Sequence, residues 1–194
     1  VDDDVLAAVK QIQDGHGGID VLVNNAGFGM YGAMEESTIA DARYQFEVNL
    51  FGMARLTQLA LPAMRKKGAG TIINISSMGG KIYTPLGSWY HATKHAVEGW
   101  SDCLRLELAP FGIQVVIIEP GAIATEWGNI MLKPMLKRSG NGPYQALAHA
   151  MAKAMHSSYG KAGAASPPSV VADAILQAVR ARRPKTRYVV GKLA

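Results

Sequence analysis

The chain has 194 residues, a formal net charge of +5 and 48% hydrophobic residues. This composition excludes a disordered chain, and the apolar runs are far shorter than the roughly 18 residues that a transmembrane helix needs. Because Cys103 is the only cysteine, no intramolecular disulfide can form, and we expect a reducing, cytoplasmic environment.

Helical and strand-like segments alternate along the chain. Acidic residues open a helix predicted over 3–15, a short apolar strand follows at 19–24, and apolar side chains spaced by three or four predict a long helix over 39–67. The further predicted elements are a strand at 71–75, a helix at 88–110, a strand at 113–118, a helix at 167–183 and a strand at 188–190. This alternation predicts one α/β domain with a doubly wound, Rossmann-like parallel sheet.

Residues 124–166 interrupt the alternation. They are rich in Met, Gly, Ala and Ser and show no strand pattern, so we expect a partly helical lid. The lid and the segment after the first strand carry apolar side chains that either form a hydrophobic substrate pocket or simply pack as core. They are Trp127, Ile130, Met131, Leu132, Met135 and Leu136, together with Phe28, Met30 and Tyr31.

Five basic residues lie close together near the C-terminus. Since no aromatic residue lies between the arginines, we interpret the run as the solvated C-terminal end of the helix at 167–183 and expect no nucleic-acid partner. The run consists of Arg180, Arg182, Arg183, Lys185 and Arg187.

Small, polar or glycine-containing turns follow three of the predicted strands. In a parallel α/β sheet such turns meet at one edge, where the bare backbone can approach a ligand closely. The turns are Asn25-Ala26-Gly27, Ser76-Ser77 and Pro120-Gly121-Ala122-Ile123-Ala124-Thr125.

Tyr90 and Lys94 are four residues apart and share one face of the helix at 88–110. A tyrosine can protonate the alkoxide that hydride transfer to a carbonyl produces. An ammonium about 4 Å away stabilises a phenolate by about 4 kcal/mol at an effective dielectric constant of about 20, so we predict a Tyr90 pKa near neutrality.

Ser77 lies 13 residues before Tyr90 and can donate a hydrogen bond to the oxyanion. Asn49, inside a predicted helix, has either a local functional role or a structural bond to the backbone.

These residues, in this order and spacing, resemble the short-chain dehydrogenase/reductase family, and residues 89–102 are most similar to its 17β-hydroxysteroid-dehydrogenase-like branch. The resemblance implies an NAD(P)-dependent oxidoreductase, with NADP slightly favoured, that interconverts a secondary alcohol and a ketone. It implies a homodimer or homotetramer formed through the helices at 39–67 and 88–110. The catalytic residues it implies are Asn49, Ser77, Tyr90 and Lys94, with Asn49 in a water-mediated proton relay to Lys94. The cofactor contacts it implies are Asn25, Ala26, Gly27, Tyr90, Lys94, Pro120, Gly121, Ile123 and Thr125.

One departure from the family is large. The glycine-rich first turn and the two strands around it have no counterpart here, so the chain fits the C-terminal two-thirds or more of one dinucleotide-binding domain. We expect on the order of 60 further residues upstream, which is two βα repeats. Without them, the strand at 19–24 should have one bare edge.

Three other interpretations remain beside this one. The stripe of His91, His95 and Glu98 has metal-ligand spacing, but no second segment supplies further ligands, so we expect no metal. Cys103 lies among apolar neighbours, where a thiol stays protonated and unreactive. The alternative functions are a non-catalytic dinucleotide-binding regulatory or scaffolding domain, and an epimerase or dehydratase with the same Tyr–Lys pair.

Overall fold

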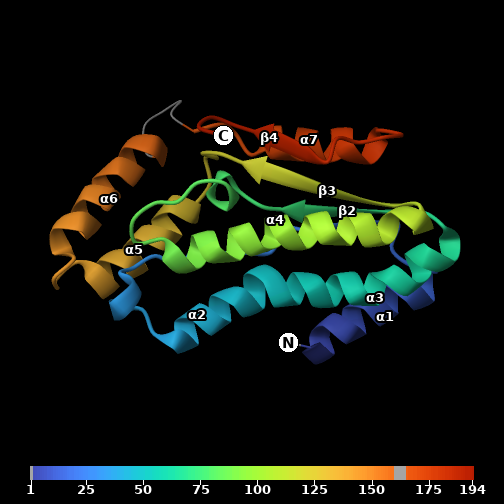
Figure 1. Cartoon of the computed structure of the whole chain (residues 1–194), viewed down its shortest axis with the longest axis horizontal. Coiled ribbons are helices and arrows are strands. Elements are labelled where there is room, and N and C mark those ends of the chain that lie inside the picture. The colour runs from blue at the N-terminus through green and yellow to red at the C-terminus, as the bar shows by residue number, and fades with distance from the viewer. Residues whose placement is uncertain (1, 160–164) are drawn as a thin grey trace.

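The computed structural model describes residues 2–159 and 165–194, and within them a four-stranded sheet has helices on both faces (Figure 1). All neighbouring strands are parallel, in the order β1-β2-β3-β4. The strands are β1 Val21–Asn24, β2 Gly70–Ile75, β3 Ile113–Pro120 and β4 Arg187–Val190. The predicted α/β fold with a parallel sheet is confirmed.

The helices form two layers around the sheet and a group at one end. Helices α3 and α4 pack on one face and α7 on the other, while α5 and α6 lie beyond the carboxyl ends of β2 and β3 (Figure 1). The helices are α1 Asp2–His16, α2 Ile39–Phe46, α3 Gly52–Lys67, α4 Ser88–Leu108, α5 Trp127–Ser139, α6 Gln145–Tyr159 and α7 Ser169–Arg180. Single turns are η1 Met34–Glu36, η2 Glu47–Phe51, η3 Met78–Gly80 and η4 Ala109–Phe111.

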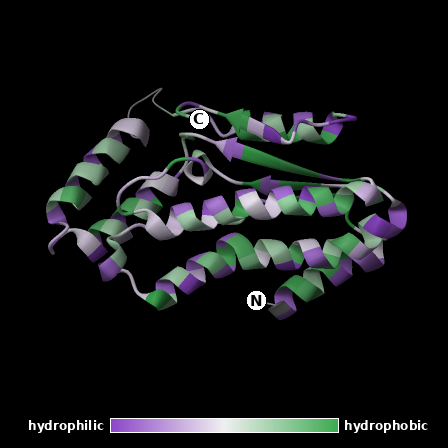
Figure 2. Cartoon of the chain, in the orientation of Figure 1, coloured by the Kyte–Doolittle hydropathy of each residue, from purple (hydrophilic) through white to green (hydrophobic). Residues whose placement is uncertain are grey.

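The two central strands are buried on both sides, as their continuous apolar sequences predict. Alternate residues of each strand point to opposite faces, so Ile72 and Val115 pack towards α3 and α4, whereas Ile73 and Val116 pack towards α7. Hydrophobic colouring runs along most of β3, and hydrophilic colouring appears at its carboxyl end, where Glu119 lies (Figure 2). The apolar central part of the sheet therefore forms core, and the polar carboxyl end of β3 is available for a functional site.

Three predicted helix boundaries differ from the structure. The long helix over 39–67 is divided by the π-helical turn η2, and α4 stops at Leu108 because Pro110 cannot donate the next helical hydrogen bond. The helix predicted over 167–183 ends at Arg180. The interpretation of the basic run as one helix end is therefore wrong, and Arg187 lies in β4 with its guanidinium turned towards buried carboxylates.

The segment 124–166 is mostly helical, as predicted, and its residues 160–164 lie outside the described part of the chain. Most of its apolar side chains are core: Met131, Leu132 and Met135 are buried against Tyr31 and Tyr90. For these three residues, core packing rather than pocket lining is the correct interpretation.

Strand β1 pairs with β2 alone among the described elements, and Val21 and Val23 on it are 37% and 39% exposed. This is the bare strand edge that the sequence predicts. The upstream segment itself stays a prediction. In the described part of the chain, no helix has the length and apolar character needed to cross a membrane.

Candidate active site

A cavity of about 770 Å³ opens at the carboxyl ends of the strands, where the three predicted turns meet. Most of the predicted site residues line it, whereas Ala26 and Asn49 do not. Those that line it are Asn25, Gly27, Ser77, Tyr90, Lys94, Pro120, Gly121, Ile123 and Thr125. The topology thus brings together side chains that are far apart in the sequence.

Tyr90 lies in the first turn of α4 and is 6% exposed. Its ring packs against Tyr31 and Trp127, with ring centroids 5.7 and 5.5 Å away. Burial raises the pKa of Tyr90 above its ordinary value, although a hydrogen bond with the Ser77 side chain works in the opposite direction. The prediction of a Tyr90 pKa near neutrality is therefore wrong for this structure, because desolvation is the largest effect and the charges of Tyr31 and Tyr159 raise the pKa of Tyr90 as well.

Lys94 lies one helical turn after Tyr90 and is 7% exposed. Its Nζ atom donates a hydrogen bond of 2.8 Å to the carbonyl oxygen of Ile75, at the end of β2. Burial lowers the pKa of Lys94 to about 8, and the negative charge of Glu98 acts against this decrease. At neutral pH the ammonium form still predominates, so the cavity contains one buried positive charge.

The two serines that follow β2 have different surroundings. The Ser77 hydroxyl caps η3 by accepting a 3.0 Å hydrogen bond from the amide of Gly79, and it is the hydroxyl that pairs with Tyr90. Ser76 is 3% exposed, and its hydroxyl has no hydrogen-bond partner within the described residues. The structure thus places Ser77, rather than Ser76, beside the Tyr90 hydroxyl, as the spacing predicts.

Asn49 sits in the π-helical turn and is 1% exposed. Its Oδ1 accepts from the Phe28 amide at 3.0 Å, and its Nδ2 donates to the Phe28 carbonyl at 2.9 Å and to the Thr93 hydroxyl at 3.1 Å. Asn49 therefore joins the turn after β1 to α4. This is the structural role that the sequence left open, and the proton relay stays a prediction. π-Helical turns are frequent at functional sites.

Two glycines bring bare backbone to the cavity. A Cβ atom on Gly27 would lie 3.2 Å from Asn49 Oδ1 and 3.9 Å from Lys94 Nζ, and one on Gly121 would lie 2.1 Å from the carbonyl oxygen of Lys192. At Gly121 only glycine permits so close an approach of the chain, whereas at Gly27 a Cβ atom would be tight against Asn49. The open backbone around Lys94 and along the turn after β3 fits the nicotinamide end of a dinucleotide.

Aromatic and sulfur-containing side chains from the helical segment close one side of the cavity. Trp127 is the only one of the six predicted lid residues that lines it, and Ile130 is 60% exposed. Sequence reasoning missed Met155 and Tyr159 on α6, although both line the cavity and the Tyr159 ring lies 5.9 Å from that of Trp127. Their apolar spacing was a usable signal, but it did not reveal which face of α6 points inwards.

The alternative chemistries find little support in the geometry. The Nδ1–H of His91 donates to the Gly79 carbonyl at 2.9 Å, and its Nε2 accepts from the Thr84 amide at 3.1 Å. Glu98 faces Lys81 and Arg187 instead of His91, and the described residues contain no group of three or more ligands suited to a metal. Cys103 is exposed, so the expectation of an apolar environment for its thiol is wrong.

A parallel sheet with a ligand-sized cavity at the carboxyl ends of its strands defines a Rossmann-like α/β protein. The model of the short chain dehydrogenase family matches residues 2–133. The chain therefore belongs to the short-chain dehydrogenase/reductase family. Its place in the 17β-hydroxysteroid-dehydrogenase-like branch stays a prediction.

Individual relatives agree with this assignment. The oxidoreductase BOA17 of Botryotinia fuckeliana is 38% identical over 188 residues, which are 96% of this chain and 66% of that protein. A 3-ketodihydrosphingosine reductase of Bacteroides thetaiotaomicron is 46% identical over 121 residues, 62% of this chain and 45% of that protein. The crystal structure of a short-chain dehydrogenase from Streptomyces avermitilis is 34% identical with a TM-score of 0.81, covering 99% of this chain and 67% of that one. The chain thus spans about half to two-thirds of the length of these proteins.

Proposed function

We propose that the protein is an NAD(P)-dependent oxidoreductase that interconverts a hydrophobic secondary alcohol and the corresponding ketone. The observation that carries this proposal is the meeting of the Ser77 and Tyr90 hydroxyls with the Lys94 ammonium in one cavity at the strand ends. Membership of the family and the oxidoreductase BOA17 as a relative support it. A slight preference for NADP is part of the proposal and rests on resemblance alone.

When bound, the nicotinamide supplies or accepts the hydride. Lys94 and the backbone of Gly27 and of the turn from Pro120 to Thr125 would hold it. Tyr90 gives its phenolic proton to the carbonyl oxygen, and Ser77 donates a hydrogen bond to the same oxygen. Because burial keeps the Tyr90 phenol protonated at neutral pH, the side chain is in the form that ketone reduction uses. The Lys94 ammonium then stabilises the phenolate that remains.

The lining of the cavity supports a hydrophobic substrate. Tyr31, Trp127, Met155 and Tyr159 form much of one side, and within residues 2–159 and 165–194 Lys94 is the only Lys, Arg, Asp or Glu that lines it. A sugar acid or a nucleotide would need further charged or amide groups to replace its hydration. The similarity to a protein named 3-ketodihydrosphingosine reductase supports a ketone as the substrate.

The substrate class can be tested on the protein expressed from its natural gene. We expect NADPH or NADH oxidation with acetophenone or a long-chain methyl ketone, at a kcat/KM at least about tenfold above that for a polar keto acid. Trp127→Ala should reduce the kcat/KM for the hydrophobic ketone, whereas the matched control Ile130→Ala, on the same helix but exposed, should not.

Preference for the keto acid would contradict the hydrophobic class. Dinucleotide binding without turnover of any carbonyl compound would favour the non-catalytic alternative.

We also propose that the protein forms a homodimer or homotetramer through the helices at 39–67 and 88–110. Support comes from large apolar side chains that these segments expose: Tyr44 is 64%, Phe51 53% and Leu106 78% exposed. Sedimentation velocity should show a dimer or tetramer, and Leu106→Glu should shift the population towards the monomer. A wild-type monomer at micromolar concentration would contradict this.

A further inference from the structure

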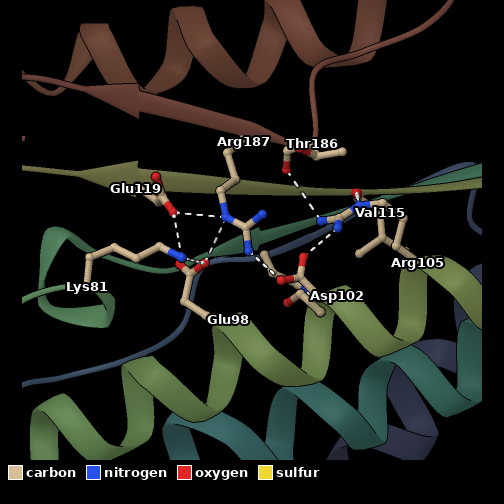
Figure 3. A network of polar contacts seen from close by, with 10 residues as sticks. Lys81, Glu98, Asp102, Arg105, Val115, Glu119, Thr186 and Arg187 are labelled. Atoms are coloured by element: carbon tan, nitrogen blue, oxygen red, sulfur yellow. Dashed lines mark hydrogen bonds and ion pairs between the residues drawn. The ribbon is translucent and has the colours of Figure 1, made fainter.

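A cluster of charged side chains lies where α4, the turn after η3 and the strands β3 and β4 meet (Figure 3). Oε2 of Glu98 lies 3.0 Å from Lys81 Nζ and 3.1 Å from Arg187 Nε. Oε1 of Glu119 lies 3.7 Å from Lys81 Nζ and 3.2 Å from Arg187 Nε. Two carboxylates and two cations thus form one connected group.

The two carboxylates are the buried members of this cluster. The side chains of Glu98 and Glu119 are 7% and 6% exposed, while those of Lys81 and Arg187 are 48% and 28% exposed. A carboxylate stays charged at such a depth only if cations and hydrogen bonds replace its hydration. Each cation here serves both carboxylates, so the cluster depends on all four side chains.

The members of the cluster come from the same segments that carry the candidate active site. Lys81 follows Ser77 by four residues, Glu98 follows Lys94 by four residues, and Glu119 directly precedes Pro120. The cluster therefore cross-links the turn with Ser77, the helix with Tyr90 and Lys94, and the strand end that leads into the Pro120–Thr125 turn. A shift of any one of these segments would break at least one ion pair.

We propose that Glu98 is a positioning residue for the active site: it anchors the Ser77 turn and the end of β3 to α4 through Lys81 and Arg187, and it places a negative charge one helical turn from Lys94. The inference rests on the proposed oxidoreductase function, and it concerns residues to which that function assigns no role.

The electrostatics of the site support this role. The negative charge of Glu98 raises the pKa of Lys94 against the effect of burial. Burial, and next the charge of Glu98, raise the pKa of Glu119, while Lys81 and Arg187 lower it. The charged groups that face Glu98 are Lys94 on its own helix, Lys81 after η3, Glu119 on β3 and Arg187 on β4.

Asp102 provides a matched control on the same helix. Its Oδ2 lies 2.6 Å from Arg187 Nη2 and its Oδ1 lies 2.5 Å from Arg105 Nη1, so Asp102 belongs to the same network (Figure 3). However, it follows Lys94 by eight residues, which is about 12 Å along a helix and beyond a Debye length of about 8 Å at physiological ionic strength. If the network had only a structural role, Glu98→Gln and Asp102→Asn would change the titration midpoint of Lys94 to a similar extent.

The test is an NMR titration of the Lys94 side chain in the protein expressed from its natural gene, with Lys94→Met to assign the signal. We expect Glu98→Gln to lower the titration midpoint of Lys94 by about one pH unit, and Asp102→Asn to leave it within about 0.3 units. The alkaline limb of kcat/KM for acetophenone reduction should move in the same direction as the Lys94 midpoint. Glu98→Gln should also lower the midpoint of Glu119, because the like charge beside it is gone.

A Lys94 midpoint that is unchanged in Glu98→Gln, or that moves equally in Asp102→Asn, would overturn the proposal. If Glu98→Gln does not fold, Lys81→Met is the variant that tests the proposal. It removes a half-exposed cation, so the titration midpoint of Lys94 must rise if the cluster acts on Lys94. A downward or absent shift there contradicts the proposal. The titration of Lys94 does not require turnover. If the protein reduced no ketone, the proposed function would be refuted, and the titration would still test the effect of Glu98 on Lys94.

Discussion

Replacement of Asn49 by alanine removes the side chain that joins the turn after β1 to α4. The Phe28 amide loses the side-chain acceptor Asn49 Oδ1. The Phe28 carbonyl keeps a 3.1 Å hydrogen bond from Gln45 Nε2, and the Thr93 hydroxyl still donates to the Tyr90 carbonyl at 2.8 Å. The Phe28 amide is therefore left without this partner in a part-buried position, on a residue that lines the cavity.

The magnitude follows from these contacts. An unpaired buried donor costs about 1–3 kcal/mol, and the part-buried Phe28 amide falls at the low end of this range. The two hydrogen bonds lost by Asn49 Nδ2 contribute about 0.5–1.5 kcal/mol each. We expect Asn49→Ala to lower the free energy of unfolding by about 3 kcal/mol. Since small domains have about 5–15 kcal/mol of stability, the variant should still fold.

The assay is urea unfolding followed by circular dichroism, with the m-value compared between variants. Gln58→Ala is the matched control, because it also truncates a side-chain amide in the same helical segment but at an exposed position, and it should change stability by less than about 0.5 kcal/mol. A loss in Asn49→Ala no greater than in Gln58→Ala would refute the idea that Asn49 holds this turn in place.

Two further predictions concern the packing around the cavity. Met135→Ala removes a side chain that is 0% exposed and packs in the cluster with Tyr31 and Tyr90. It should lower the free energy of unfolding by about 2–5 kcal/mol in the same assay. A loss below about 1 kcal/mol would contradict this packing. Burial raises the pKa of Tyr31 from 10.0 to about 12, so above pH 10 the folded protein keeps a proton that the unfolded chain releases. The free energy of unfolding should therefore fall as the pH rises from 10 towards 12. In Tyr31→Phe the urea midpoint should decline less steeply over this pH range.

Much of the site could be predicted because a parallel sheet obeys simple geometry. Apolar runs identify the buried strands, and the residues just after them meet at one edge, which is why Ser77, Gly27 and Pro120 line the same cavity. The helical spacing of four residues likewise placed Tyr90 and Lys94 on one face.

The features that the sequence did not reveal depend on tertiary contacts. A π-helical turn adds a single residue to a helical turn, so the apolar periodicity over 39–67 did not indicate the interruption at Asn49. The raised pKa of Tyr90 depends on burial against Tyr31 and Trp127, which come from two other segments. Arg187 appeared to belong to a solvated basic run because its partners Glu98 and Glu119 are far away in the sequence.

The measurement that tests the account most directly is the turnover of Tyr90→Phe in the protein expressed from its natural gene, with Tyr188→Phe as control. Tyr188 is also buried, but it lies on β4 and its hydroxyl accepts a 3.3 Å hydrogen bond from the Lys185 amide outside the cavity. We predict that Tyr90→Phe lowers kcat for ketone reduction at least about 100-fold with little change in dinucleotide affinity, because the ring remains and only the proton donor is lost. Tyr188→Phe should keep kcat within a few-fold of the wild type. A Tyr90→Phe variant with a near-normal kcat would contradict the assignment of Tyr90 as the proton donor.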